Sequence, residues 1–403
     1  MGAALNSVAD GRLSGLCDKY KELLAGEAPC IVGAPMVRGS ELAFRMLLRR
    51  RGVRICYTPM IKADHLVAGG ADEWSVLESC EEDRPLVAQL AGRDPAILAA
   101  AARLVLDNLA VDALDLNLGC PQECAQEGGY GAFLQEEPEL AAACVEAMCR
   151  VATTVPVFCK IRVLGNPEAT VAYARRLEAA GCSLLTVHCR TREAKHRGEP
   201  DFEHLARVAA AVNIPVVANG GIGSLEEAAD AIRRSGAVAA MAATSLLRCP
   251  RAFAREDHNG CEGQWNPAEL AWEYLHFAGK YPPPSPLYVR KHLRWIFREL
   301  LQPAHVEAYQ GWLQGINTDE ADWRARAWTF LEQPYLKELW QFRALVQLVA
   351  HHNQWLVGLE AGQECSPLLS FREIRVGAEC EKLAEEEPSV EWLFAEDGLV
   401  GGC

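Results

Sequence analysis

Between residues 31 and 244, short apolar runs alternate with longer stretches rich in Ala, Leu, Arg and Glu. The runs have the length of strands and the stretches have the length of helices, an alternation typical of parallel βα units. We expect eight strands, over residues 31–36, 54–60, 85–92, 111–118, 156–163, 183–190, 215–220 and 238–244. Eight units within ~215 residues favour a closed (β/α)₈ barrel, the TIM barrel, because a Rossmann sheet needs fewer strands and an early glycine-rich turn.

The stretches between the strands carry the signals of helix ends. We expect helices over residues 41–51, 95–109, 138–152, 167–180, 202–211 and 225–235. Several begin with proline or an acidic residue and end before glycine, as helix termini prefer. Beyond Pro250 the pattern changes to Trp-rich and Leu-rich helical periodicity, notably over residues 288–301 and 321–357. The chain is therefore predicted to be an α/β protein, a TIM barrel with a C-terminal helical domain.

The chain divides into four parts by these patterns. They are an N-terminal extension (1–27), the catalytic barrel (28–255), the helical domain (256–365) and an acidic, flexible tail (366–403). The net charge is −14, and much of it arises from acidic residues after position 378. A strongly acidic chain does not favour nonspecific nucleic-acid binding unless its charges are segregated. Here they are partly segregated, because the body before the tail is only mildly acidic.

Composition restricts the class of protein. No run approaches the roughly 18 unbroken apolar residues of a membrane span, and the N-terminus lacks a basic region followed by an apolar one. We expect a soluble monomer of the cytoplasm, with the nucleus left open as a second compartment. The 16 cysteines are scattered through the predicted strands and helices, which indicates reduced thiols. Cys120 and Cys124 lack a second close Cys or His pair, so no metal site is expected.

Polar or backbone-exposing residues stand at the ends of seven predicted strands. Active sites of TIM barrels sit at the C-terminal ends of the strands, so these residues are expected to form one site. They are Pro35 and Met36 (strand one), Gln89 (three), Asn117 and Cys120 (four), Lys160 and Arg162 (five), His188 and Arg190 (six), Asn219, Gly220 and Gly221 (seven), and Ala243 and Thr244 (eight).

The residue types at these strand ends suit a bound cofactor. A ring with carbonyls and ring nitrogens would take amide partners such as Gln89 and Asn117, and an anionic reduced ring would take a cation such as Lys160. A phosphate would take the backbone after strands seven and eight. The alternative is structural, with Cys120 as a packed thiol and His188 as a hydrogen-bonded core imidazole. Seven strand ends at once favour the cofactor site.

The predicted helix over residues 288–301 carries a basic stripe. Arg290, Arg294 and Arg298 recur at i, i+4 and i+8, with apolar residues largely on another face. Such a stripe can bind the phosphates of a nucleic acid, and a solvated helix face is its commoner meaning. Both interpretations remain open at this point.

Seven segments together resemble the tRNA-dihydrouridine synthases, most closely the eukaryotic branch that acts on uridines 16 and 17 of the D loop. They are Ala34-Pro35-Met36, Tyr57-Thr58-Pro59-Met60, Asp115-Leu116-Asn117-Leu118-Gly119-Cys120-Pro121-Gln122, Tyr130-Gly131-Ala132-Phe133-Leu134, Lys160-Ile161-Arg162, Val187-His188-Cys189-Arg190-Thr191-Arg192-Glu193 and Ala218-Asn219-Gly220-Gly221-Ile222. The resemblance spans about residues 28–300.

The resemblance implies an FMN enzyme, reduced by NADPH or NADH, that reduces uridine in tRNA to 5,6-dihydrouridine. Hydride passes from the reduced flavin to C6, and Cys120 donates the proton to C5. FMN would be bound by Pro35, Met36, Gln89, Asn117, Lys160, His188, Asn219, Gly220, Gly221, Ala243 and Thr244. The substrate would be bound by Arg162 and Arg190, together with the stripe of Arg290, Arg294 and Arg298. Ala243-Thr244-Ser245 replaces the Gly-Arg pair of the family or the acidic-Gly pair of its branch, a change that is compatible with weak retention of FMN.

Two other functions remain open. One is a flavin barrel that acts on a small molecule, such as a dihydropyrimidine or an enone, and the other is a catalytically weak tRNA-binding descendant. The helical extension favours RNA, because a barrel that acts on a small molecule has no need of it.

Overall fold

The computed structural model describes residues 18–24, 29–253, 266–301, 327, 331 and 339–352. These residues form two compact units. The first contains the described residues up to Leu246 together with residues 250–253. The second contains residues 247–249 and the described residues from 266 onward.

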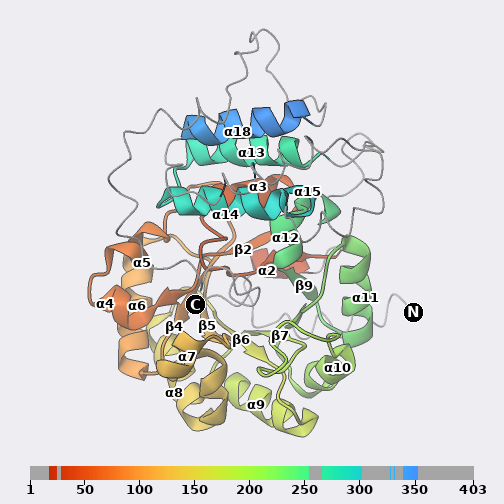
Figure 1. Ribbon diagram of the computed structural model, residues 1–403. Helices are drawn as coiled ribbons and strands as arrows, with labels where there is room; N and C mark the ends of the chain where they lie inside the picture. The colour runs from red at the N-terminus through yellow and green to blue at the C-terminus, as the bar shows by residue number, and fades with distance from the viewer. Residues whose placement is uncertain are drawn as a thin grey trace. The chain divides into compact units, whose positions relative to one another are not determined.

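Parallel strands close into a barrel in the first unit (Figure 1). In order around the ring they are β1 (Ile31–Gly33), β2 (Ile55–Tyr57), β4 (Leu86–Ala91), β5 (Ala113–Leu118), β6 (Val157–Arg162), β7 (Leu184–His188), β8 (Val216–Asn219) and β9 (Ala239–Ala242), which pairs with β1. The closed ring of eight strands confirms the predicted TIM barrel.

The second predicted strand is interrupted in the structure. It was expected over residues 54–60, but β2 ends at Tyr57, and a separate short strand, β3 (Ile61–Lys62), begins after the expected range and pairs with β4 beyond β2. The Thr58 N–H still donates to the Val87 carbonyl at 2.9 Å. Pro59 follows, and because it has no N–H to donate, the ladder breaks there.

All six helices predicted between the strands are present, to within a few residues at each end. They are α3 (Leu42–Arg50), α6 (Pro95–Asn108), α8 (Pro138–Val151), α9 (Pro167–Ala179), α10 (Phe202–Ala211) and α11 (Leu225–Ser235). Side-chain caps start four of them: Asp94, Asn166, Asp201 and Ser224 accept hydrogen bonds from the first free N–H groups. Shorter elements lie in the loops: α4 (Ala63–Val67), α5 (Ala71–Ser75), α7 (Glu123–Glu127) and the 3₁₀ helix η1 (Gly131–Glu136).

The barrel interior is filled by apolar side chains at the N-terminal ends of the strands. Val32, Val87 and Phe158 belong to this core. Helix α2 (Asp18–Leu24) contributes Tyr20, whose ring meets Phe158 edge-on with centroids 5.4 Å apart. Part of the predicted N-terminal extension therefore belongs to the barrel core, a role that a helix of seven residues does not signal in sequence.

The described part of the second unit is helical. It contains α13 (Pro267–Lys280), α14 (Pro286–Ile296), α15 (Arg298–Leu301) and α18 (Leu339–His352), and α13 packs against both α14 and α18. The prediction of a single helix over residues 288–301 is wrong, because α14 ends at Ile296 and the backbone of Phe297 leaves the helical conformation. The predicted tail (366–403) lies outside the described residues, as does most of the range 321–357. No helix among the described residues has the length and apolar character to cross a bilayer.

Candidate active site at the barrel mouth

The inner face of the barrel changes from apolar to polar toward the C-terminal ends of the strands. Successive side chains of a strand point to opposite faces, so residues two and four positions after an inner residue also face inward. Ala113, Phe158 and Leu184 lie in the interior core. The inward positions that follow on β5, β6 and β7 are Asp115 and Asn117, Lys160 and Arg162, and Thr186 and His188. The polar residues expected at these strand ends therefore share one inner face.

A chain of side-chain hydrogen bonds links β4 to β5 on this face. Gln89 Nε2 donates to Asp115 Oδ2 at 2.8 Å, and Asn117 Nδ2 donates to Gln89 Oε1 at 2.9 Å. Asn117 Oδ1 accepts from the backbone N–H groups of Gly119 at 3.1 Å and Cys120 at 3.0 Å. These bonds tie the loop that carries Cys120 to the strands behind it.

Cys120 lies in a small cluster at the mouth, beside Met60, Ala91 and Tyr130, and is 2% exposed. The chain returns against it at Gly131, whose φ is +64°. A Cβ at Gly131 would lie 2.8 Å from the Cys120 carbonyl oxygen, so only glycine fits there without a shift. That carbonyl also accepts from the Ala132 N–H at 2.9 Å. The backbone of Cys120 is thus held on both sides.

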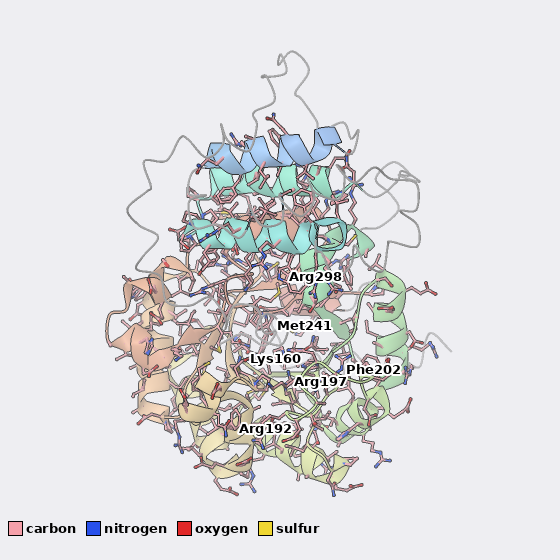
Figure 2. The ribbon with its side chains drawn as sticks, viewed as in Figure 1. Lys160, Arg192, Arg197, Phe202, Met241 and Arg298 are labelled. Atoms are coloured by element: carbon pink, nitrogen blue, oxygen red, sulfur yellow. The ribbon has the colours of Figure 1, made fainter. Side chains whose placement is uncertain are left out.

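Two ionisable side chains near Cys120 have displaced pKa values. Burial, reinforced by the positive charge of Arg162, lowers the pKa of Lys160 to about 8. Burial raises the pKa of Asp115 to about 7, opposed by its hydrogen bond from Gln89 and by the charge of Lys160. Lys160 lies within the ring of strands in Figure 2. Perturbed groups gathered at a barrel mouth are typical of a functional site.

Arg162 is 1% exposed and holds two loops together. Its Nε donates to the Gly119 carbonyl at 2.7 Å, and its Nη1 donates to the carbonyls of Thr191 at 3.1 Å and Lys195 at 2.7 Å. Lys195 adopts a left-handed φ of +51°. Arg162 therefore connects the Cys120 loop to the loop after β7, and its predicted contact with the substrate stays a prediction.

His188 and two glycines form a narrow cradle after β7 and β8. Burial, followed by the charges of Arg162 and Lys160, lowers the pKa of His188 well below its usual value, so its imidazole is neutral. Gly220 has φ +123° and Gly221 has φ +67°. A Cβ on Gly220 would lie 3.0 Å from His188 Cδ2, and one on Gly221 would lie 3.2 Å from Arg190 Nη2. Bare backbone is needed at both positions.

The other predicted site residues also lie at strand ends. Asn219 Nδ2 donates to the Met241 carbonyl at 2.9 Å, and Arg190 Nε donates to the Gly198 carbonyl at 2.9 Å. Pro35 and Met36 are buried just after β1. Ala243 follows β9 and Thr244 begins α12 (Thr244–Arg248), and both are half-buried. The roles assigned to these residues stay predictions.

The predicted basic stripe lies in the second unit and is divided between two helices. Arg290 and Arg294 belong to α14, and Arg298 begins α15. All three are half-buried. The Arg298 guanidinium lies over the Trp295 ring, 5.0 Å from its centroid, and Arg248 lies over the same ring at 5.3 Å. The apolar face is as predicted, since Leu293 and Ile296 are buried.

Asp115 was missed in the sequence, although it stands two residues before Asn117. The period of two along a strand is the signal that places both on the inner face. The close approach of Gly131 to Cys120 has no such signal, because it arises where the chain returns to the mouth. Cys159, Cys182 and Cys189 are free thiols, as expected. Within the described ranges, no group of three or more His, Cys, Asp or Glu side chains is arranged to bind a metal ion.

Comparison with known proteins gives consistent matches. A family model described as dihydrouridine synthase (Dus) matches residues 32–320. A tRNA-dihydrouridine(16/17) synthase-like protein of Rattus norvegicus, whose name carries NAD(P)(+), is 44% identical over 277 residues, which are 67% of this chain and 60% of the relative. The tRNA-dihydrouridine(16/17) synthase of Saccharomyces cerevisiae is 40% identical over 234 residues, 56% of this chain and 54% of the relative.

A human tRNA-dihydrouridine(20a/20b) synthase-like protein is 37% identical over 244 residues, 60% of this chain and 76% of the relative. The matched part of the chain spans about three fifths of the rat relative and just over half of the yeast relative.

Proposed function

The chain belongs to the dihydrouridine synthase family, whose model matches most of its length. From that premise we propose that it reduces uridine to 5,6-dihydrouridine in the D loop of tRNA. FMN is the cofactor and NADPH or NADH is the reductant. The observation that carries the proposal is the position of Cys120. Its loop is held against the same inner face that presents Lys160 and His188.

The residues at the mouth fit an FMN group. Gly220 and Gly221 have no room for a Cβ beside His188 and Arg190, and the backbone at this place in a TIM barrel is the usual site of a phosphate. Lys160 is a half-buried cation on the inner face, suited to an anionic ring. Burial and nearby positive charges lower the pKa of His188 and favour its neutral form, in which one ring nitrogen donates a hydrogen bond and the other accepts one. Gln89 and Asn117 offer amide groups from the adjacent strands.

When bound, FMN would supply the hydride that C6 of the uracil receives, after reduction by the nicotinamide. The remaining step belongs to Cys120. Its thiol gives the proton to C5, which carries enolate-like charge once C6 has gained the hydride, and the thiolate is reprotonated from solvent. Asn117 fixes the loop from which that thiol acts. Arg162 fixes the same loop from the other side, through the Gly119 carbonyl.

The substrate has to be an unstacked uridine. Cys120 is buried in a cluster with Met60 and Tyr130, and a base within a duplex stack cannot reach a thiol in that position. Loop nucleotides are the part of an RNA that is most easily turned out of the stack. The names of the rat and yeast relatives carry the positions 16/17, which supports a D-loop target.

A reconstituted reaction tests the proposal. Purified protein is incubated with FMN, NADPH and a tRNA transcript without modifications, and dihydrouridine is measured by mass spectrometry. We expect dihydrouridine to form in the D loop. A folded protein that binds FMN and oxidises NADPH with a dihydropyrimidine or an enone, but leaves the tRNA unchanged, would instead support a barrel that acts on a small molecule. A folded, colourless protein that takes up no added FMN would contradict the proposal altogether.

A further inference from the structure

The hydrogen bonds that lead from the Cys120 loop into the barrel can run in only one direction. The backbone N–H groups of Gly119 and Cys120 can only donate, so Asn117 must turn its oxygen toward them. The Asn117 NH₂ group then faces Gln89, which must turn its own oxygen toward Asn117 and its NH₂ group away. The chain of hydrogen bonds therefore has to end on an acceptor.

Asp115 is the group at that end. Its Oδ2 accepts from Gln89 Nε2 at 2.8 Å, and the two residues are register partners on β4 and β5. The side chain is 0% exposed, so it cannot touch a base that enters the mouth. Its other oxygen, Oδ1, has no hydrogen-bond partner among the described residues. Among the described residues, acceptance from Gln89 is thus the one hydrogen bond of the Asp115 side chain, and the charge of Lys160 acts on the same carboxylate.

We propose that Asp115 is a positioning residue that fixes the orientation of the Gln89 and Asn117 amides and so holds the Cys120 loop in place. The inference rests on the proposed function only in so far as Cys120 is the acid. Without an acceptor at position 115, the buried NH₂ group of Gln89 loses its partner. If the Gln89 amide flips, so that its oxygen replaces its NH₂ group beside position 115, its NH₂ group faces the NH₂ group of Asn117. The hydrogen bond between the two amides is then broken instead.

The test measures the N–H groups at the end of the chain of hydrogen bonds. Amide hydrogen exchange of residues 119 and 120 is followed in the purified full-length parent and in Asp115→Ala and Asp115→Asn. A buried polar group without its partner costs about 1–3 kcal/mol, which corresponds to roughly 5- to 150-fold faster exchange in Asp115→Ala. Asn carries an oxygen that can accept from Gln89, so Asp115→Asn should exchange within a few-fold of the parent.

Thr186→Val is the matched control. Thr186 is also fully buried on the inner face, on β7, and its hydroxyl takes no part in the hydrogen bonds that join Asp115, Gln89 and Asn117. Its replacement should leave exchange at residues 119 and 120 unchanged. If Asp115→Ala does not fold, Gln89→Leu breaks the same chain one residue nearer to Cys120 and should show the same faster exchange.

Two half-reactions give a second readout. Reduction of bound FMN by NADPH needs no proton from Cys120. The assays are run with saturating FMN, because Gln89 and Asn117 are also assigned to the cofactor. Under these conditions Asp115→Ala should lose uridine reduction by about 10-fold or more, and the rate of FMN reduction should change by less. Asp115→Asn should recover uridine reduction. The proposal is overturned if Asp115→Ala exchanges like the parent, if Asp115→Asn is as impaired as Asp115→Ala, or if Thr186→Val is equally impaired. A parent that does not reduce uridine would contradict the proposed function and leave the exchange result standing.

Discussion

The backbone N–H of Cys120 donates to the Asn117 side chain, and the carbonyl of Cys120 accepts from the Ala132 N–H. The Cys120 side chain meets Met60 and Tyr130, and it is almost fully buried. A proton donor that acts on carbon has to stay within a short distance of its target during hydride transfer. The rigid backbone around Cys120 provides that constraint, so changes to its side chain should affect proton transfer and little else.

Cys120→Ala should lower the rate of uridine reduction by about 10²–10⁴-fold, the usual contribution of a positioned acid. FMN content and FMN reduction by NADPH should match the parent, because neither needs the thiol. Cys124→Ala is the control, since Cys124 lies in the same loop at the start of α7. Single-turnover kinetics separate the two half-reactions. Parent-like turnover in Cys120→Ala would exclude Cys120 as the acid and make Cys124 the next candidate.

Burial raises the pKa of Asp115 to about 7, from a usual value near 4, and this gives a pH dependence of stability. Between about pH 4 and 7 the folded protein binds more protons than the unfolded chain, so the free energy of unfolding falls as pH rises. Asp115→Asn lacks this titration. Relative to that variant, the parent should lose stability on the order of 4 kcal/mol across the window.

Denaturant unfolding of both proteins at several pH values checks this expectation. Lys160 faces Asp115, and burial lowers the pKa of Lys160 to about 8. Below about pH 7.5 Lys160 stays largely protonated in the folded and the unfolded protein, so its titration contributes little to the comparison. A difference between parent and variant that stays constant with pH would show that Asp115 is not buried as a weak acid.

At the scale of elements, the loop after β8 depends on glycine. Gly220→Ala would force a side chain into φ +123°, with its Cβ 3.0 Å from His188 Cδ2. Strain of this kind costs about 1–3 kcal/mol. We expect the free energy of unfolding to fall by that amount and FMN to bind less tightly. Gly236→Ala is the control, because its φ is +69° but no atom lies within 4 Å of the added Cβ. It should lose stability without losing FMN.

Absorbance of the purified proteins and equilibrium titration with FMN measure this effect. If Gly220→Ala binds FMN as tightly as Gly236→Ala does, the loop after β8 does not approach the cofactor.

At the same scale, the basic stripe of α14 and α15 gives a prediction about tRNA binding. Changing Arg290, Arg294 and Arg298 to Glu should weaken tRNA binding and flatten its salt dependence, by about one unit of slope in log K against log salt for each phosphate that the variant no longer binds. FMN content should not change. Filter binding across a salt series measures both quantities. If affinity and slope equal those of the parent, the RNA must bind elsewhere, and the loop with Arg190, Arg192 and Lys195 becomes the candidate.

For the whole molecule, the eight strands and six helices of the barrel were predictable because apolar periodicity and helix caps are local signals. The inner face of β5 was also predictable in principle, since Asp115 and Asn117 share a period of two. Three features depend on long-range packing and were not predictable. These are the insertion of Tyr20 into the barrel core, the break of the predicted helix at Phe297, and the approach of Gly131 to Cys120.

The central claim is that this chain makes dihydrouridine in the D loop of tRNA. The direct measurement maps dihydrouridine at each D-loop position in tRNA from cells with and without the protein, and from cells that carry only Cys120→Ala. We predict that at least one D-loop position loses dihydrouridine without the protein, and that Cys120→Ala does not restore it while Cys124→Ala does. Unchanged dihydrouridine at every D-loop position after removal of the protein would contradict the claim.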